Sequence, residues 1–474
     1  MDKTTAKLDH GKILPLILSL IVPAIISQLI TFLYNIIDRI YVSHIEESGM
    51  DALAALGIVL PITLIIQAFS NFVGLGGSPR ASMMMGKGDM KEANKIFNTS
   101  FLLLFLLGIL ISVVTYLFAK DIVVLFGCPD SAVEFATSYL KIYSLGSLFV
   151  LLSQGLNPFI TGLGHSFLAM ISILIGVLLN IGLDPLFIYA LDMGVKGAAL
   201  ATILSQAVSF VWILCFFLSK KSLFKISFMD MKPEWKRIYS ILSLGFSPFI
   251  MTLTECAIQI VFNINLNWST NGDSNYTAAL TIMLSALQLI SLPLNGIGYG
   301  MQPFVSYNYG KGNGKRLKEG IRDATILAFI FGVVVYSISM IFPILYARLF
   351  GASSQVKNIV VRYTPIFLMG TIMFFVQMTL QNINVALGQA LSALLLAVNR
   401  KVVLLIPMCF ILTHYIGFEG VYFSEGITDF VAGIITSITF LITFPRIFKK
   451  CELNAHGNSS SKENSNIENT EPHS

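Results

Sequence analysis

The stretch VGLGGSPRASMMMGKGD, residues 73–89, has a counterpart later in the chain, IGYGMQPFVSYNYGKGN, residues 297–313. At an offset of 224 residues, seven of these 17 positions are identical. The same offset places LFG at 125–127 over LFG at 349–351. One offset that aligns separate motifs indicates an internal duplication. The identical positions are Gly74, Gly76, Pro79, Ser82, Gly86, Lys87 and Gly88.

The composition indicates a membrane protein. Of the 474 residues, 55% are hydrophobic and only 12% are charged, with a mean hydropathy of +0.76. A soluble protein needs more polar surface than this. The apolar runs are continuous and about 20 residues long, which is typical of transmembrane helices and not of outer-membrane strands. We expect twelve spans, at 14–42, 53–79, 97–119, 135–161, 168–191, 197–218, 240–266, 277–303, 324–347, 362–386, 400–416 and 420–444.

The duplication and the spans together predict the domain organisation. The expected fold is an all-α integral membrane protein with two six-helix bundles, at residues 1–218 and 238–450, joined by a basic loop at 219–237. Because six is even, both bundles insert with the same orientation and are related by a pseudo-two-fold axis along the membrane normal. The polar segment after Cys451 is low in complexity and is predicted to be disordered.

The basic residues predict the orientation in the membrane. With the N-terminus inside, 24 of the 31 Lys and Arg residues lie on the cytoplasmic side, and these include Arg400 and Lys401 at the start of the expected span 400–416. Because cytoplasmic loops carry an excess of Lys and Arg, both termini are predicted to be cytoplasmic in a multi-pass protein of the cell membrane. The net charge of +5 is therefore attributed to topology, and no nucleic-acid partner is expected.

Several chemistries have no supporting motif. The five cysteines have no metal-binding or redox spacing, and no phosphate-binding loop GxxxxGK[ST] is present. We therefore expect no cofactor. Nothing in the sequence indicates an ATPase, so any process that needs energy would depend on an ion gradient.

Five acidic residues lie well inside apolar runs. Each costs about 2.5–3.5 kcal/mol on insertion scales, so each is a functional candidate. They are Asp38, Asp184, Glu255, Glu425 and Asp429.

Asp184 lies in NIGLDPLFI, residues 180–188. Asn180 is one turn earlier on the same helix face. Pro185 lacks an N–H and crowds the carbonyl of Ile181, so a half-unwound helix could present several oxygen atoms to a hard cation. The alternative is a proline kink in which Asp184 pairs with a neighbouring residue.

The motifs resemble the multidrug and toxic compound extrusion (MATE) family along nearly the whole chain. The resemblance rests on SLIVPAIISQLITFLYNIIDRIYVSHI, on the repeated glycine motif, on GLGHSFLAMISILIGVLLNIGLDPLFIY and on GVKGAALATILSQ. It is greatest for the bacterial and archaeal branch that includes staphylococcal-type exporters. The resemblance implies a V-shaped pair of bundles that exports amphipathic, often cationic compounds in exchange for Na⁺ or H⁺.

The resemblance also implies a coupling site in the N-terminal half. Residues that match its cation-binding positions are Asp38, Asn180, Asp184 and Thr202. Asp38 has an alternative interpretation, because with the adjacent Arg39 it could mark the outer end of a helix. The sequence does not distinguish Na⁺ from H⁺ as the coupling ion.

The acidic residues of the second half are less clear. Glu255 matches an acidic coupling position of another MATE branch, but the partner Asp of that branch is missing, because residues 363–387 contain no Asp or Glu. Glu255 could bind substrate or a proton alone, or pair with Gln288. Glu425 and Asp429 are four residues apart on one helix face, where like charges repel. Neither is assigned a primary role.

The function predicted from these features is a monomeric, cation-coupled antiporter. Its partners would be amphipathic or cationic small molecules and the lipid bilayer. Flexible and aromatic side chains suit varied ligands, so they are candidates for lining the substrate cavity. Two alternatives stay open: a flippase of the wider superfamily, moving a lipid-linked or polar metabolite, and a membrane-embedded enzyme. The predicted substrate or coupling residues are Gln28, Tyr34, Asn35, Met251, Glu255, Met283 and Met301.

Overall fold

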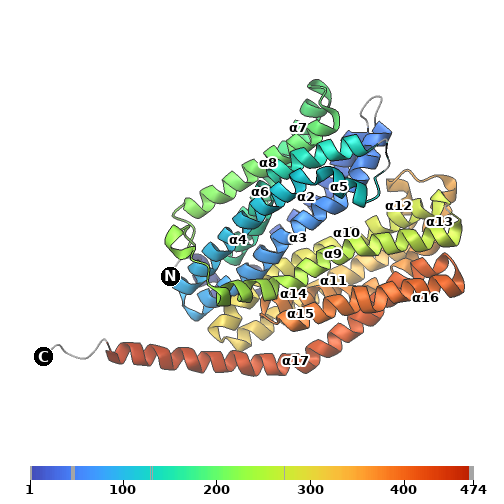
Figure 1. The fold of residues 1–474 in the computed structure, drawn as a ribbon. Helices are drawn as coiled ribbons and strands as arrows, with labels where there is room; N and C mark the ends of the chain where they lie inside the picture. The colour runs from blue at the N-terminus through green and yellow to red at the C-terminus, as the bar shows by residue number, and fades with distance from the viewer. Residues whose placement is uncertain (1–2, 44–48, 129, 131, 272, 469–474) are drawn as a thin grey trace. The chain divides into compact units, whose positions relative to one another are not determined.

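The computed structural model describes residues 3–43, 49–128, 130, 132–271 and 273–468, which are all-helical apart from turns and short connections (Figure 1). The helices before the central connection are α1 Lys3–His10, α2 Ile13–Ser43, α3 Gly49–Lys87, α4 Met90–Leu117, α5 Ala119–Leu125, α6 Val133–Gly162, α7 Ser166–Pro185, η1 Leu186–Ala190 and α8 Gly194–Leu218. After it come η2 Phe228–Asp230, α9 Trp235–Thr270, α10 Ser274–Lys311, α11 Gly314–Ile341, α12 Ile344–Leu349, α13 Ser354–Phe367, α14 Thr371–Ala386, α15 Ala390–Val398, η3 Asn399–Leu405, α16 Ile406–Ile416 and α17 Glu419–Glu468.

The helices account for the predicted membrane spans. Among the described residues, 11 helical segments are long and apolar enough to cross a membrane. A twelfth is obtained if α13 and α14, which are bent by 58° at a short break, form one broken span. The prediction of an all-helical membrane protein is therefore confirmed, with 11 to 12 candidate spans.

The chain forms two compact units that cut across the sequence halves. Unit 1 contains residues 1–21, 79–93 and 261–474, and unit 2 contains residues 22–78 and 94–260. Close contacts at glycines join segments from different sequence halves within each unit. In unit 2 a Cβ on Gly76 would lie 3.0 Å from the Cα of Gly245, and in unit 1 a Cβ on Gly300 would lie 2.7 Å from the Cα of Ile21. These two contacts correspond to one another at the 224-residue offset, so the duplicated helices pack in equivalent ways.

A second reciprocal contact lies in unit 1, between the ends of α3 and α10. A Cβ on Gly86 would collide with the carbonyl of Tyr307, and a Cβ on Gly310 would collide with the carbonyl of Met83. The 224-residue offset relates these pairs too. The repeated glycines that reveal the duplication therefore let the two helix backbones approach closely.

The short helix α1 also packs in unit 1. Asp9 forms an ion pair with Lys311 at the end of α10. Arg316 of α11 donates a hydrogen bond from Nη2 to the carbonyl of Gly11 at 2.6 Å. These contacts tie the start of the chain to the helices of the second sequence half.

The basic connection at 219–237 begins as a structured segment of unit 2. Asn98 of α4 donates to the carbonyl of Lys225 at 2.9 Å, and the Lys225 N–H donates to Asn94 Oδ1 at 2.7 Å. Phe224 stacks on Phe97, with ring centroids 5.5 Å apart. The start of this loop is therefore held against α4.

The last helix, α17, runs from Glu419 to Glu468 (Figure 1). The disorder predicted after Cys451 stays a prediction.

Candidate functional site

Three helices of unit 2 bring the four predicted coupling residues together. Asp38 comes from α2, Asn180 and Asp184 from α7, and Thr202 from α8. All four are buried, and Asp184 has no exposed surface. We call these four residues the N-half site.

Hydrogen bonds link three of these residues. With the Asn180 amide oriented so that its nitrogen faces Asp184, the nitrogen donates to Asp184 Oδ2 at 2.9 Å. Its oxygen then accepts from the Thr202 backbone N–H at 3.2 Å. The Thr202 hydroxyl donates to the carbonyl of Ala198 at 3.0 Å, so its lone pairs face the other groups. Asn180 therefore acts as a bridge between the two helices.

Tyrosines complete the polar surroundings of the N-half site. Tyr34 and Tyr139 lie close enough to the Thr202 side chain to interact with it, and Tyr143 lies close to Gln67. Sequence reasoning identified Tyr34 but missed the other three residues. A signal was present, because Tyr139 is matched by the repeat and Tyr143 follows it by one helical turn.

The backbone after Asp184 differs from the expected unwound helix. Pro185 is the last residue of α7, and the chain continues as the π-helical segment η1. A π-helical turn accommodates a residue that cannot donate a hydrogen bond, and such turns are frequent at functional sites. The helix therefore widens instead of breaking.

Asp184 lies beside a second negative charge. Asp38 is close enough for its charge to act on Asp184. Among the described residues, no Lys or Arg forms an ion pair with Asp184. Two neighbouring buried carboxylates are costly unless a cation or a shared proton reduces the repulsion. Within the same described residues no three His, Cys, Asp or Glu side chains could hold a metal ion, so neutral oxygens would have to supply further ligands.

A second buried polar cluster lies in unit 1 and corrects the sequence prediction. Arg400 was expected at the cytoplasmic end of the span 400–416, but it lies in the π-helical segment η3, inside the helical segment Ala390–Ile416. Its Nε donates to Asp429 Oδ1 at 2.7 Å and its Nη2 donates to Glu425 Oε1 at 3.0 Å. We call Arg400, Glu425 and Asp429 the arginine cluster.

The arginine cluster is fully enclosed. The side chains of Arg400, Glu425 and Asp429 are 5%, 4% and 1% exposed, and the guanidinium lies 4.5 Å from the ring centre of Phe374. Lys401, also expected at the cytoplasmic end of that span, is buried as well. One cation between two carboxylates removes most of the repulsion that the spacing of Glu425 and Asp429 predicts.

The remaining predicted substrate residues are scattered. Glu255 is exposed on α9 within a candidate span, and Gln28 and Met251 are partly buried. Met283 and Met301 have no exposed surface in α10, and their place in a substrate cavity stays a prediction. Methionine fills gaps in packed interiors equally well. The side chain of Asn35 lies outside the described residues.

These features define a class: a polytopic, all-helical membrane transporter built by duplication, with buried acidic residues inside its spans. The MatE family profile matches the chain twice, at residues 23–186 and 249–411. The chain therefore belongs to the MatE family. The second match starts 226 residues after the first and ends 225 residues after it, close to the offset of the repeat.

Similar proteins agree with this assignment. The multidrug export protein MepA of Staphylococcus saprophyticus is 26% identical over 91% of this chain and 94% of its own length. A solved multidrug resistance MATE family transporter in an outward-facing conformation aligns with a TM-score of 0.87 at 26% identity, covering 95% of this chain and 99% of its own. A transporter of the MOP superfamily from Pyrococcus furiosus, described as having a binding pocket of reversed polarity that suggests a different function, has the same TM-score at 25% identity, covering 95% and 99%.

The family assignment settles the broad function. The chain is a multi-pass membrane protein of a family of multidrug exporters, and the members of this family are transporters and not enzymes. This removes the membrane-embedded enzyme from the alternatives.

Proposed function

We propose that this protein is a cation-coupled antiporter that exports amphipathic, often cationic compounds by alternating access. The observation that carries the proposal is the N-half site, where two buried carboxylates meet an amide and a hydroxyl. The multidrug export proteins to which the chain is similar support the substrate class.

The N-half site supplies the ligands that such coupling needs. Na⁺ prefers oxygen ligands, which Asp38, Asp184 and Thr202 offer together with the Asn180 amide oxygen. A proton could instead be shared between the two carboxylates. Either cation would lower the electrostatic cost of the pair, so the state that binds the cation is stabilised relative to the state that does not.

In this proposal, alternation acts at the reciprocal glycine contacts in unit 1. They join the two sequence halves at the end of α3 and α10 that the charge pattern predicts to be cytoplasmic. Opening towards the cytoplasm would require these contacts to separate. The proposal includes cytoplasmic termini and a protein that acts as a monomer in the cell membrane. An impermeant maleimide added outside cells should label Cys128, and no external labelling of this residue would contradict the orientation.

The test of coupling is ethidium efflux from cells. Asp184→Asn and Asp38→Asn should each abolish efflux while the protein inserts normally, because the amide cannot carry the charge that a cation neutralises. Asp192→Asn is the matched control, since Asp192 is exposed just after the same helix, and it should leave efflux unchanged. Unchanged efflux in both site variants would overturn the proposed site.

The coupling ion is assigned in reconstituted vesicles. Efflux driven by a Na⁺ gradient without a pH gradient identifies Na⁺, and the reverse identifies H⁺. Efflux in the absence of both gradients would contradict cation coupling altogether.

A flippase remains the second candidate, because a similar structure is described as having a pocket that suggests a different function. A flippase for a lipid-linked pyrophosphate needs accessible basic residues. Arg400 does not provide one, because Glu425 and Asp429 enclose it. Translocation of a fluorescent lipid-linked phosphate without ethidium efflux would favour the flippase.

A further inference from the structure

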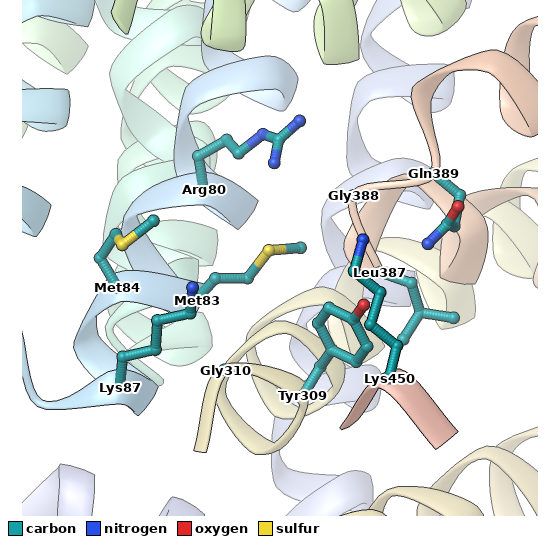
Figure 2. A pocket seen from close by; sticks show the side chains of 10 residues that line it. All are labelled: Arg80, Met83, Met84, Lys87, Tyr309, Gly310, Leu387, Gly388, Gln389 and Lys450. Atoms are coloured by element: carbon teal, nitrogen blue, oxygen red, sulfur yellow. The ribbon is translucent and has the colours of Figure 1, made fainter. Parts of the chain in front are cut away.

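A pocket of about 150 Å³ lies in unit 1, where the end of α3 meets α10, α17 and the turn between α14 and α15 (Figure 2). One face of α3 supplies residues at i, i+3, i+4 and i+7, which is the spacing of a helical stripe. The pocket belongs to unit 1, whereas the N-half site belongs to unit 2. The residues that carry its chemistry are Arg80, Lys87, Tyr309, Gly388, Gln389 and Lys450.

The lining of this pocket is positively charged. Arg80, Lys87 and Lys450 contribute three cationic groups, and no acidic residue lines the pocket. None of the three forms an ion pair with any residue that the structure describes. Tyr309 and Gln389 add a hydroxyl and an amide, which can donate hydrogen bonds.

Arg80 is partly buried, and one nitrogen of its guanidinium has no hydrogen-bond partner among the described residues. This nitrogen is Nε, which is buried. Figure 2 shows Arg80 and Met83 extending from α3 towards the turn at Gly388. A Cβ at Gly388 would lie 3.4 Å from Arg80 Nη1 and 3.1 Å from Met83 Cε. The backbone of Gly388 has a φ of +73°, which also favours glycine. Glycine therefore keeps the space beside the guanidinium open.

The pocket lies at the ends of candidate membrane spans. Lys87 is the last residue of the span Ala55–Lys87, Tyr309 lies near the end of Asn275–Lys311, and Lys450 lies near the end of Glu419–Glu452. This is the depth of lipid head groups, and the charge pattern predicts that it is the cytoplasmic side. Basic pockets between helices at this depth are suited to anionic head groups.

We propose that this pocket binds a phosphate group, carried by an anionic lipid head group or present as free inorganic phosphate. The planar guanidinium of Arg80 would bind two phosphate oxygens from inside the pocket, and Lys87 and Lys450 would approach from its rim. The positive-inside pattern explains lysines at span ends, but it does not explain an arginine with a buried, unsatisfied Nε. Since Arg80 and Lys87 belong to the first sequence half and Lys450 to the second, the anion would link the two halves at this end.

Binding is tested on the purified full-length protein in micelles, so the result does not depend on transport activity. Thermal unfolding is followed while phosphatidylglycerol, phosphatidylcholine with the same acyl chains, or inorganic phosphate is titrated. Protection by phosphatidylglycerol but not by phosphatidylcholine identifies a lipid head group, and protection by inorganic phosphate alone identifies the free ion. Arg80→Gln should weaken the protective ligand about tenfold or more, because a charged hydrogen-bonding group is removed.

The chain offers a matched control on the rim. Lys450→Gln should weaken binding severalfold, whereas Lys449→Gln, at the adjacent residue outside the pocket, should leave it unchanged. This pair keeps the proposal testable if Arg80→Gln does not fold. Equal losses of anion affinity in the two lysine variants would mean that general surface charge accounts for the binding. This result would overturn the proposal. Absence of protection by both anions would overturn it as well.

Discussion

The N-half site and the arginine cluster both bury two carboxylates in a membrane protein, but they balance the charge differently. In the arginine cluster, Arg400 contacts both Glu425 and Asp429 at 3.0 Å or less. In the N-half site, Asp184 accepts a hydrogen bond from the Asn180 amide, and Thr202 and tyrosines lie close by. The arginine cluster therefore contains its own permanent cation, whereas we propose that the N-half site takes a cation that enters and leaves.

We propose that this difference separates a structural role from a functional role. Both clusters lie beside a π-helical segment, η1 after Asp184 and η3 around Arg400, so backbone geometry does not distinguish them. Removal of one partner from a buried ion pair leaves an uncompensated charge and is strongly destabilising. Neutralisation of Asp184 breaks no ion pair with a Lys or Arg among the described residues, so a smaller cost is expected. Substitutions should therefore affect folding in one cluster and transport in the other.

The largest expected effect is that of Arg400→Met. It leaves Glu425 and Asp429 buried without their cation, and should cost about 3–5 kcal/mol of folding free energy. The measurement is the free energy of unfolding in micelles, together with the yield of monodisperse protein. The triple variant Arg400→Met, Glu425→Gln, Asp429→Asn should recover most of the loss, because no charge remains. A triple variant as unstable as the single one would contradict a role in charge balance.

Gly86→Ala should have an intermediate effect. The new methyl group would collide with the carbonyl of Tyr307, and overpacking of this kind costs about 1–3 kcal/mol. Because the contact joins the two sequence halves, the variant should also shift the protein away from the state in which they touch. A distance between spin labels on α3 and α10 measures this shift. Gly57→Ala on the same helix meets nothing within 4 Å and should leave the distance unchanged.

The smallest expected effect is that of Thr202→Val. It keeps the side-chain shape but removes the hydroxyl that Tyr34 and Tyr139 contact, at a cost of about 1 kcal/mol, and should raise the cation concentration for half-maximal efflux about fivefold. Thr325→Val in α11 is the control, because the hydroxyl of Thr325 donates only to the carbonyl of Ile321. Equal shifts in the two variants would remove Thr202 from the site.

Hydropathy and the internal repeat predicted the fold class, because lipid requires long apolar helices and a duplication preserves its glycine spacing. The same evidence did not predict the compact units. The exchange of residues 79–93 depends on backbone contacts between distant helices, such as Gly310 against Met83. A repeat shows that two segments are equivalent, but not which segment each one packs against.

The site was predicted unevenly for a similar reason. The positions of Asp38, Asn180, Asp184 and Thr202 followed from a family resemblance and from helical spacing, and the structure brings them together. Arg400 was misplaced because the positive-inside rule treats basic residues as solvated. Its partners Glu425 and Asp429 lie 25 and 29 residues away, on a different helix. The sequence signal was the one-turn spacing of Glu425 and Asp429. This spacing predicts a repulsion between like charges that a buried cation would relieve.

Cation binding by the purified protein tests the central claim most directly. Bound radioactive Na⁺ and the protons released when ethidium is added are measured for the native protein, for Asp184→Asn and for the neutralised triple variant of the arginine cluster. We predict that Asp184→Asn loses whichever of the two signals the native protein gives, and that the folded triple variant keeps it. Full binding in Asp184→Asn, or a loss confined to the triple variant, would contradict the account.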